Sequence, residues 1–305
     1  MSSRRQFIQQ LVWGGAGFIA AQYPESSYAK DDFVQITILH TNDMHCHIEP
    51  FPKSDPLNGG KGGMTHLSGI IEKIRAESPA VFLFDAGDMF QGTPYFNYYR
   101  GELVLKIMSQ MGYDAGTIGN HEFDNGLEGI GEALPFARFP LLSSNYDFSD
   151  TELNGSVANY KTFRKEGIKI GLYALGVELD GLVAKKNFQG TRYLDPLTIA
   201  RKMELFLKEE KKCDLVVCLS HLGLEYEEKK VSDKIIAGET HCTDLIIGGH
   251  THTFLDDAIR MKNAAGKQVM VNQVGYGALM LGRIDFMFDR NRKVQTTVSA
   301  SLKNG

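Results

Sequence analysis

After its first thirty residues the sequence contains no long hydrophobic run, no marked excess of either charge and few cysteines. Its 305 residues carry 33 basic and 37 acidic side chains, a net charge of −4 at pH 7. A mildly acidic chain lacks the basic footprint of a nucleic-acid-binding protein. Without 18 consecutive apolar residues there is no stable membrane anchor, and a soluble mature protein is expected. With 43% apolar and 23% charged residues, the main state is globular rather than disordered.

The first 29 residues have the parts of an export signal. Arg4 and Arg5 precede a short Gly- and Ala-rich apolar stretch, and Ser27-Tyr28-Ala29 offers small residues for cleavage. The paired arginines resemble the bacterial twin-arginine signal, which exports folded proteins. A chance basic amphipathic start is the alternative. We therefore expect a signal peptide over residues 1–29, a catalytic domain over residues 30–305, and a periplasmic or other extracytoplasmic location.

The four cysteines are too few for a disulfide scaffold in a chain of this length. Export would nevertheless place them in an oxidising compartment. Cys213 and Cys242 each come just before an apolar strand-like run, so a bridge between neighbouring strand starts is one interpretation. Buried free thiols are the other.

Apolar runs and helical patterns alternate along the chain, which predicts a single α/β domain. The predicted buried strands cover residues 33–39, 81–84, 115–118, 215–219 and 245–247, and the predicted helices cover 64–77, 103–111 and 199–207. After residue 267 only strands are expected, over 268–274, 279–288 and 294–299. A hairpin turn at residues 289–292 should join the last two.

Five polar clusters follow or close these apolar runs. They are Asp43-Met44-His45, Gly87-Asp88, Gly119-Asn120-His121-Glu122-Phe123-Asp124, Ser220-His221 and Gly248-Gly249-His250-Thr251-His252. Side chains at strand ends in open α/β sheets emerge into a shared crevice. The two-residue spacing within Asp43/His45 and His250/His252 predicts an extended backbone that points both side chains the same way. The preceding glycines allow tight turns.

The clusters offer only nitrogen and oxygen donors, which suits borderline divalent ions such as Zn²⁺ or Mn²⁺. The carboxylate of Asp88 has two oxygens and could bridge two such ions. A pair of cations can clamp the attacking and leaving oxygens of an in-line displacement and activate water near neutral pH. The pattern therefore predicts two divalent metal ions and hydrolytic chemistry.

The motifs resemble those of the dinuclear metallophosphoesterases, specifically the branch of 5′-nucleotidases, 2′,3′-cyclic phosphodiesterases and nucleotide-sugar hydrolases. Residues 38–45, ILHTNDMH, are similar to the first signature of that branch, and residues 113–124, YDAGTIGNHEFD, to the second. The resemblance extends from about Phe33 to Asp289. It implies a four-layer α-β-β-α sandwich with two mixed sheets face to face.

The resemblance also implies roles for single residues. Asp43, His45 and His252 would hold one ion, Asn120, His221 and His250 the other, and Asp88 would bridge them. His121 would be the catalytic histidine outside the metal shell, oriented by Asp124. An oriented imidazole could stabilise the phosphoryl oxygens and help the leaving group depart.

One position departs from the family pattern, because Cys46 stands where a Gly, Ser or Ala is usual. A thiolate there could compete as a soft ligand, although a small neutral thiol is the plainer interpretation. The remaining histidines are expected in loops or behind the ligands: His40, His47, His66 and His241. The glycine-rich residues 58–63 lack phosphate-loop spacing and predict a turn. Tyr95-Phe96-Asn97-Tyr98-Tyr99 could stack on a nucleobase, or pack onto the next helix.

Three functional hypotheses follow. The first is a secreted phosphoester hydrolase similar to 5′-nucleotidases, which acts on nucleotides or other small phosphoesters. The second is hydrolysis of sulfur esters at the same site, as in the sulfur-oxidising relatives of the family. The third is a metal-binding subunit whose specificity comes from a separately encoded C-terminal domain protein, since the family's substrate-positioning residues lie in such a domain. The residues that would bind substrate are unknown from the sequence.

Overall fold

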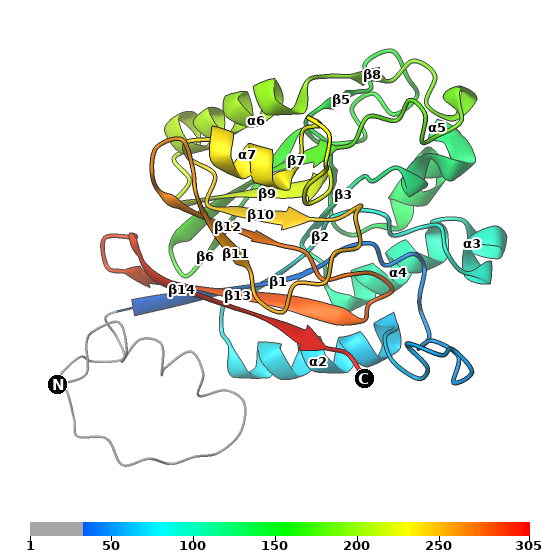
Figure 1. Ribbon diagram of the computed structural model, residues 1–305, viewed down its shortest axis with the longest axis horizontal. Helices are drawn as coiled ribbons and strands as arrows, with labels where there is room; N and C mark the ends of the chain where they lie inside the picture. The colour runs from blue at the N-terminus through cyan, green and yellow to red at the C-terminus, as the bar shows by residue number, and fades with distance from the viewer. Residues whose placement is uncertain (1–32) are drawn as a thin grey trace.

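The computed structural model describes residues 33–305, so the predicted signal over residues 1–29 lies outside the described residues. The first of two six-stranded sheets has the order β14-β13-β1-β2-β3-β4 (Figure 1). The strands β1 to β4 are parallel, and β13 and β14 add an antiparallel hairpin on the other side of β1. Their bounds are β1 Phe33–Thr41, β2 Val81–Asp85, β3 Ala115–Thr117, β4 Leu141–Leu142, β13 Met280–Asp289 and β14 Val294–Lys303.

The second sheet has the order β11-β12-β10-β9-β7-β6. Its four inner strands are parallel, and an antiparallel strand closes each edge. The bounds are β6 Tyr160–Lys165, β7 Ile168–Gly176, β9 Leu215–His221, β10 Leu245–Gly248, β11 Ile259–Lys262 and β12 Gln268–Asn272. A separate two-stranded ribbon joins β5 Tyr146–Asp147 to β8 Arg192–Tyr193.

The two sheets pack face to face with helices on both outer sides, as expected for the four-layer α-β-β-α sandwich. One apolar core contains side chains from both sheets, including Ile38 and Phe84 from the first sheet and Leu172 and Val217 from the second. The outer side of the first sheet packs against α2 Met64–Glu77, α4 Glu102–Met111 and α5 Gly126–Ala133. The outer side of the second packs against α6 Pro196–Leu205 and α7 Asp233–Glu239 (Figure 1).

The strongly patterned elements lie where the sequence predicts them. All five predicted buried strands form, as β1, β2, β3, β9 and β10, and α2 has the predicted bounds. The third predicted helix becomes α6 followed by a π-helical turn over Phe206–Glu210. The hairpin between β13 and β14 forms as expected, with the N–H of Arg292 donating to the carbonyl of Asp289.

The structure adds one strand that the sequence did not predict and decides between the two interpretations of the cysteines. The strand β7 was not predicted, although it lies in the middle of the second sheet between β6 and β9. Cys213 and Cys242 are both free thiols, so the disulfide interpretation is wrong. Among residues 33–305, no helix is long and apolar enough to cross a membrane.

Candidate dinuclear metal centre

The five polar clusters meet at one edge of the sandwich. They lie at the carboxyl ends of β1, β2, β3, β9 and β10, which are parallel strands of the two facing sheets. The two sheets thus contribute to one crevice. The N–H of Asp43, after β1, donates to the carbonyl of Gly87, after β2. The N–H of His250, after β10, donates to the carboxylate of Asp43 at 3.0 and 3.1 Å.

Within this crevice, two groups of side chains are arranged so that each could hold a metal ion. Asp43, His45 and His252 form the first group, and Asp88, His221 and His250 form the second. In each group the potential ligand atoms lie within 4.8 Å of one another. Six of the seven predicted ligands therefore converge in two clusters.

The ligand loops reach this arrangement through left-handed turns, and the expected extended backbone at Asp43/His45 and His250/His252 is wrong. The φ angles are 50° at Asp43, 47° at His45, 73° at His250 and 51° at His252. The strands β1 and β10 end before these residues, at Thr41 and Gly248. A left-handed residue other than glycine costs about 1–3 kcal/mol, so the surrounding contacts must hold these loops in place.

The histidine tautomers in the crevice suit a metal ion. Nδ1 of His45 lies 2.6 Å from the carbonyl of Gln91, and Nδ1 of His221 lies 2.7 Å from the carbonyl of Ala86. Because a carbonyl can only accept, each Nδ1 carries a proton and donates it to that carbonyl, so Nε2 is the ring atom left to bind a metal ion. Nε2 of His45 faces Nε2 of His252 at 3.0 Å. These donors fit a divalent cation.

Asp88 supplies the carboxylate of the second group, and Asn120 adds an amide oxygen beside that group. Oδ2 of Asp88 lies 3.0 Å from Nε2 of His221, and its Oδ1 accepts the N–H of His121 at 2.8 Å. Burial opposes ionisation of Asp88, but the facing His221 outweighs it and holds the pKa of Asp88 below its ordinary value. Oδ1 of Asn120 is buried and has no hydrogen-bond partner. A buried amide oxygen without a partner is suited to a cation.

The glycine before Asn120 allows the loops of β2 and β3 to approach closely. A Cβ atom at Gly119 would lie 2.3 Å from Oδ1 of Asp88 and 2.8 Å from Nε2 of His221. No side chain fits at this position without displacing the predicted ligands.

His121 and Asp124 form the predicted pair on a short 3₁₀ helix over His121–Asn125. Nδ1 of His121 lies 2.8 Å from Oδ2 of Asp124, and the ring of His121 lies 5.3 Å from that of His45. The hydrogen bond to Asp124 raises the pKa of His121, while burial partly opposes that change. An imidazole held in this way at the edge of the crevice can donate a hydrogen bond or a proton.

Sequence reasoning assigned no role to Glu122, although it lies inside the quoted motif. Its buried carboxylate accepts the backbone N–H groups of Gly119, Asp88, Met89 and Phe90 at 2.6 to 3.1 Å. Glu122 therefore ties the loop that carries Asp88 to the loop that carries Asn120. An acidic residue inside the motif, between His121 and Asp124, was the available signal.

The other histidines and Cys46 lie outside both groups. The expected place of His66 in a loop or behind the ligands is wrong, because His66 is exposed on α2. His40 is fully buried between the sheets, where burial lowers its pKa to about 3. His47 stacks on Phe51 with ring centroids 4.2 Å apart. Cys46 belongs to neither donor group, and burial raises the pKa of its thiol to about 11, so the thiol is neutral in the metal-free protein.

The tyrosine-rich segment forms α3 Pro94–Tyr99, close to the first group. Gly92, just before this helix, packs against the backbone of His45, and Thr93 donates to the carbonyl of Cys46. Phe96 is buried, whereas Tyr98 is 82% exposed and Tyr99 is 50% exposed. The expected packing of this segment onto the protein therefore holds for Phe96, whereas Tyr98 and Tyr99 keep much of their side chains exposed.

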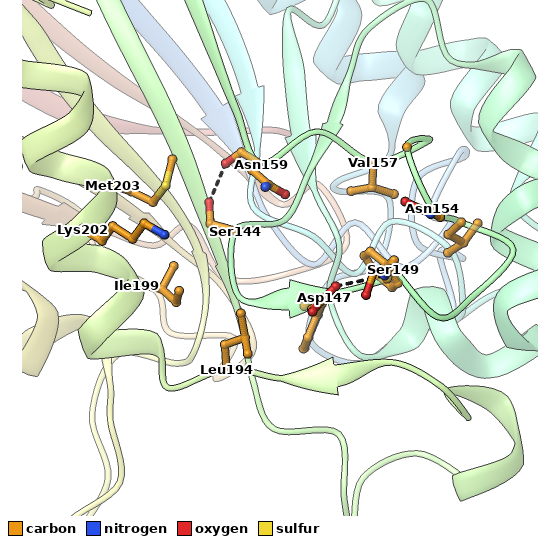
Figure 2. A pocket seen from close by; sticks show the side chains of 14 residues that line it. Ser144, Asp147, Ser149, Asn154, Val157, Asn159, Leu194, Ile199, Lys202 and Met203 are labelled. Carbon is orange, nitrogen blue, oxygen red and sulfur yellow. Dashed lines mark hydrogen bonds between the residues drawn. The ribbon is translucent and has the colours of Figure 1, made fainter. Parts of the chain in front are cut away.

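A groove of about 510 Å³ lies between residues 144–159 and α6 (Figure 2). Lys202 and Met203 of α6 line one side of it, and Asn154 and Val157 line the other. Its lining also includes Tyr146, whose ring contacts Phe123 edge to face at 5.5 Å. None of the predicted site residues lines this groove.

The model of the calcineurin-like phosphoesterase family matches residues 36–254, a range that contains every predicted site residue. The chain belongs to the calcineurin-like phosphoesterase family. Among its relatives, a snake venom 5′-nucleotidase of Gloydius brevicauda is 30% identical over 92% of this chain and 49% of the relative. A trifunctional nucleotide phosphoesterase of Bacillus subtilis is 31% identical over 93% of this chain and 20% of the relative.

Solved structures agree with the fold of this calcineurin-like phosphoesterase. The crystal structure of a 5′-nucleotidase precursor from Thermus thermophilus superposes with a TM-score of 0.80 at 30% identity. The match covers 89% of this chain and 55% of that one. The chain thus spans about half the length of this relative and of the snake venom enzyme.

Proposed function

We propose that this calcineurin-like phosphoesterase is a secreted dinuclear-metal phosphoester hydrolase similar to 5′-nucleotidases. The observation that carries the proposal is the pair of donor groups in one crevice beside His121 and Asp124. Its substrates would be nucleotides or related small phosphoesters, and its role nucleotide catabolism. The names of the relatives, 5′-nucleotidases and a nucleotide phosphoesterase, support this class of substrate.

Each group would hold one ion. Asp43, His45 and His252 would bind the first, and Asn120, His221 and His250 would bind the second. Asp88 would bridge the two ions. Its Oδ2 faces His221, a ligand of the second ion, and the loop that carries Asp88 packs against the loop of Asp43, a ligand of the first. Mixed nitrogen and oxygen donors favour Zn²⁺ or Mn²⁺. Bound divalent ions supply a water-derived nucleophile near neutral pH and offset the negative charge of the phosphoryl group.

His121 would act on the phosphoryl group from outside the metal shell. Asp124 accepts a hydrogen bond from the protonated Nδ1 of His121, which leaves Nε2 of His121 to face the substrate. A protonated His121 would stabilise a phosphoryl oxygen and donate a proton to the leaving oxygen. The raised pKa of His121 keeps a larger protonated fraction near neutral pH.

Hydrolysis of an aryl phosphate by purified protein supplied with Mn²⁺ or Zn²⁺ tests the proposal. We expect activity that disappears with a chelator and falls at least about 100-fold in His121→Ala and Asp88→Asn. Asp147→Asn is a matched control, because Asp147 pairs with Arg192 away from the crevice. Equal activity of the wild-type protein and Asp88→Asn would disprove the proposal.

A substrate panel separates the other hypotheses. Phosphomonoesters, cyclic phosphodiesters and thiosulfonate conjugates should be compared, and preference for the sulfur ester would replace the phosphoesterase proposal. A subunit that depends on a separately encoded C-terminal domain protein should be weakly selective alone and gain nucleotide selectivity on adding that protein. A monomer already active and selective for nucleotides would argue against such a partner.

We also propose export by the twin-arginine route to the periplasm. The motivation is the Arg4-Arg5 pair and the following apolar stretch. Replacing both arginines by lysine should retain the protein in the cytoplasm. Unchanged export of that variant would contradict this route.

A further inference from the structure

Gln273 lies directly after β12, beside the loop that carries His250 and His252. Its side chain is fully buried. Because β12 pairs in parallel with β10, with Asn272 opposite Ile247, the residue after β12 lies beside Gly248, the last residue of β10. A Cβ atom at Gly248 would lie 3.3 Å from Nε2 of Gln273.

The side-chain amide of Gln273 spans the whole ligand loop. Nε2 donates to the carbonyl of Gly249 at 2.6 Å, on the near side of His250. Oε1 accepts the backbone N–H of Thr253, on the far side of His252, and the hydroxyl of Thr251 at 3.0 Å. One amide thus contacts the residue before, the residue between and the residue after the two histidines.

This loop needs such support because both histidines have left-handed backbones, with φ of 73° and 51°. Residues other than glycine rarely adopt these angles unless their surroundings impose them. If the loop relaxed towards ordinary angles, both imidazoles would turn away from their partners. His252 belongs to the first donor group and His250 to the second. One loop therefore controls a ligand in each group.

We propose that Gln273 is a positioning residue for both metal sites. It holds His250 and His252 in the geometry that binds metal before any ion arrives, through its bonds to Gly249, Thr251 and Thr253. Gln273 itself contributes no atom to either donor group. The inference rests on the proposed function, because it requires that His250 and His252 bind metal ions.

Titration of the metal-free full chain with Mn²⁺ tests the inference directly. Gln273→Met keeps the length of the side chain and removes both the donor and the acceptor. We expect its affinity for both ions to fall about 10- to 100-fold, the usual effect of losing a partner behind metal ligands. The electron paramagnetic resonance spectrum should change from a coupled pair of Mn²⁺ ions to isolated ions.

The matched control is Gln268→Met, a change of the same residue type at the other end of β12. Gln268 is exposed, and its side-chain nitrogen donates to the sulfur of Met270 at 3.3 Å, so the metal affinity of the Gln268→Met variant should equal that of the wild type. A stability role alone would lower the melting temperature of metal-free Gln273→Met and leave its Mn²⁺ affinity and coupled spectrum unchanged. That result would overturn the inference.

If Gln273→Met fails to fold, Thr251→Val provides the second measurement. It removes the hydroxyl that donates to Gln273 and that also accepts the N–H of Leu224 at 3.1 Å. We expect a fall of about 3-fold in Mn²⁺ affinity, smaller than the full effect of a lost partner. Wild-type affinity in Thr251→Val would then overturn the inference. Failure of the proposed function can be distinguished from failure of this inference. If the wild-type protein binds two Mn²⁺ ions but hydrolyses no phosphoester, the Mn²⁺ affinities of the variants relative to the wild type still test the role of Gln273. A wild-type protein that binds no Mn²⁺ would overturn both.

Discussion

The Nε2 atoms of His45 and His252 lie 3.0 Å apart, although 207 residues separate them in the chain. Nδ1 of His45 is occupied by the carbonyl of Gln91, so its Nε2 lone pair points at the other ring. Two imidazoles in this arrangement share either a proton or a cation. With Asp43 only 3.4 Å from Nε2 of His252, a divalent cation fits the charges and the donors.

Metal removal should therefore lower the stability of the folded protein. A ligand at 100 times its dissociation constant contributes about 2.7 kcal/mol, and that corresponds to roughly 5–10 °C in melting temperature for a domain of this size. Calorimetric melting with a chelator and then with excess Mn²⁺ measures the difference. His252→Ala should lose one of the two ions by elemental analysis, and a full complement of two would contradict the assignment of that ligand.

Asp124→Asn should reduce kcat roughly 100-fold with little change in KM. The carboxylate fixes the tautomer and orientation of His121, and an amide can present either a donor or an acceptor to Nδ1. Metal content should remain at the wild-type level, because Asp124 belongs to neither donor group. Steady-state kinetics and elemental analysis measure the two effects. A variant with normal kcat would show that His121 does not need this partner.

Glu122→Gln should weaken both stability and metal binding. The carboxylate accepts four backbone N–H groups, and the amide would turn an NH₂ group towards two of them, at a cost of about 1–3 kcal/mol. Chemical denaturation of the metal-free protein and titration with Mn²⁺ measure the two effects. We expect the loop that carries Asp88 to lose its fixed position and the Mn²⁺ affinity to fall.

Glu204→Gln is the matched control for that substitution. Glu204 is also a buried carboxylate, and it accepts the N–H groups of His241, Cys242 and Thr243 together with the Thr243 hydroxyl. These partners belong to the loop before β10 and contain no predicted ligand. Glu204→Gln should lower the free energy of unfolding and leave Mn²⁺ affinity unchanged. Equal losses of affinity in both variants would assign the effect to general instability.

The stability of the protein should depend on pH through Asp244. Burial raises the pKa of this carboxyl from 3.8 to about 6. The folded state holds the proton of Asp244 more tightly than the unfolded state does. Protonated Asp244 therefore stabilises the fold fully below about pH 4, and this contribution is lost as the pH rises through 6. A shift of this size corresponds to at most roughly 3 kcal/mol.

Asp244→Asn should remove this dependence, since an amide oxygen can still accept the N–H of Val216. Urea denaturation of metal-free protein at pH 4 and pH 8 measures it. Relative to the wild type, the variant should gain stability as the pH rises. A difference between the two proteins that stays constant over this range would show that Asp244 titrates normally.

Local pattern was sufficient for much of the fold and for most of the candidate site. Short apolar runs closed by polar residues identified β1, β2, β3, β9 and β10, because buried parallel strands need continuous apolar sequence. The 3.6-residue period placed α2, whose buried residues are Met64, Leu67, Ile71 and Ile74. The donor residues stood out because polar side chains that end such strands have few other reasons to be there.

The sequence by itself therefore determined which residues are the candidates for metal binding and catalysis, since hydrophobic period and residue type are local properties. Only the tertiary structure decided how they meet. Whether Asp43 and His250 lie on extended or left-handed backbone depends on contacts between loops of two sheets. The roles of Glu122 and Gln273 likewise depend on backbone groups up to 34 residues away, whose positions no local pattern contains. Long-range hydrogen bonds hold strained loops in place, and they exist only after the two sheets have packed together.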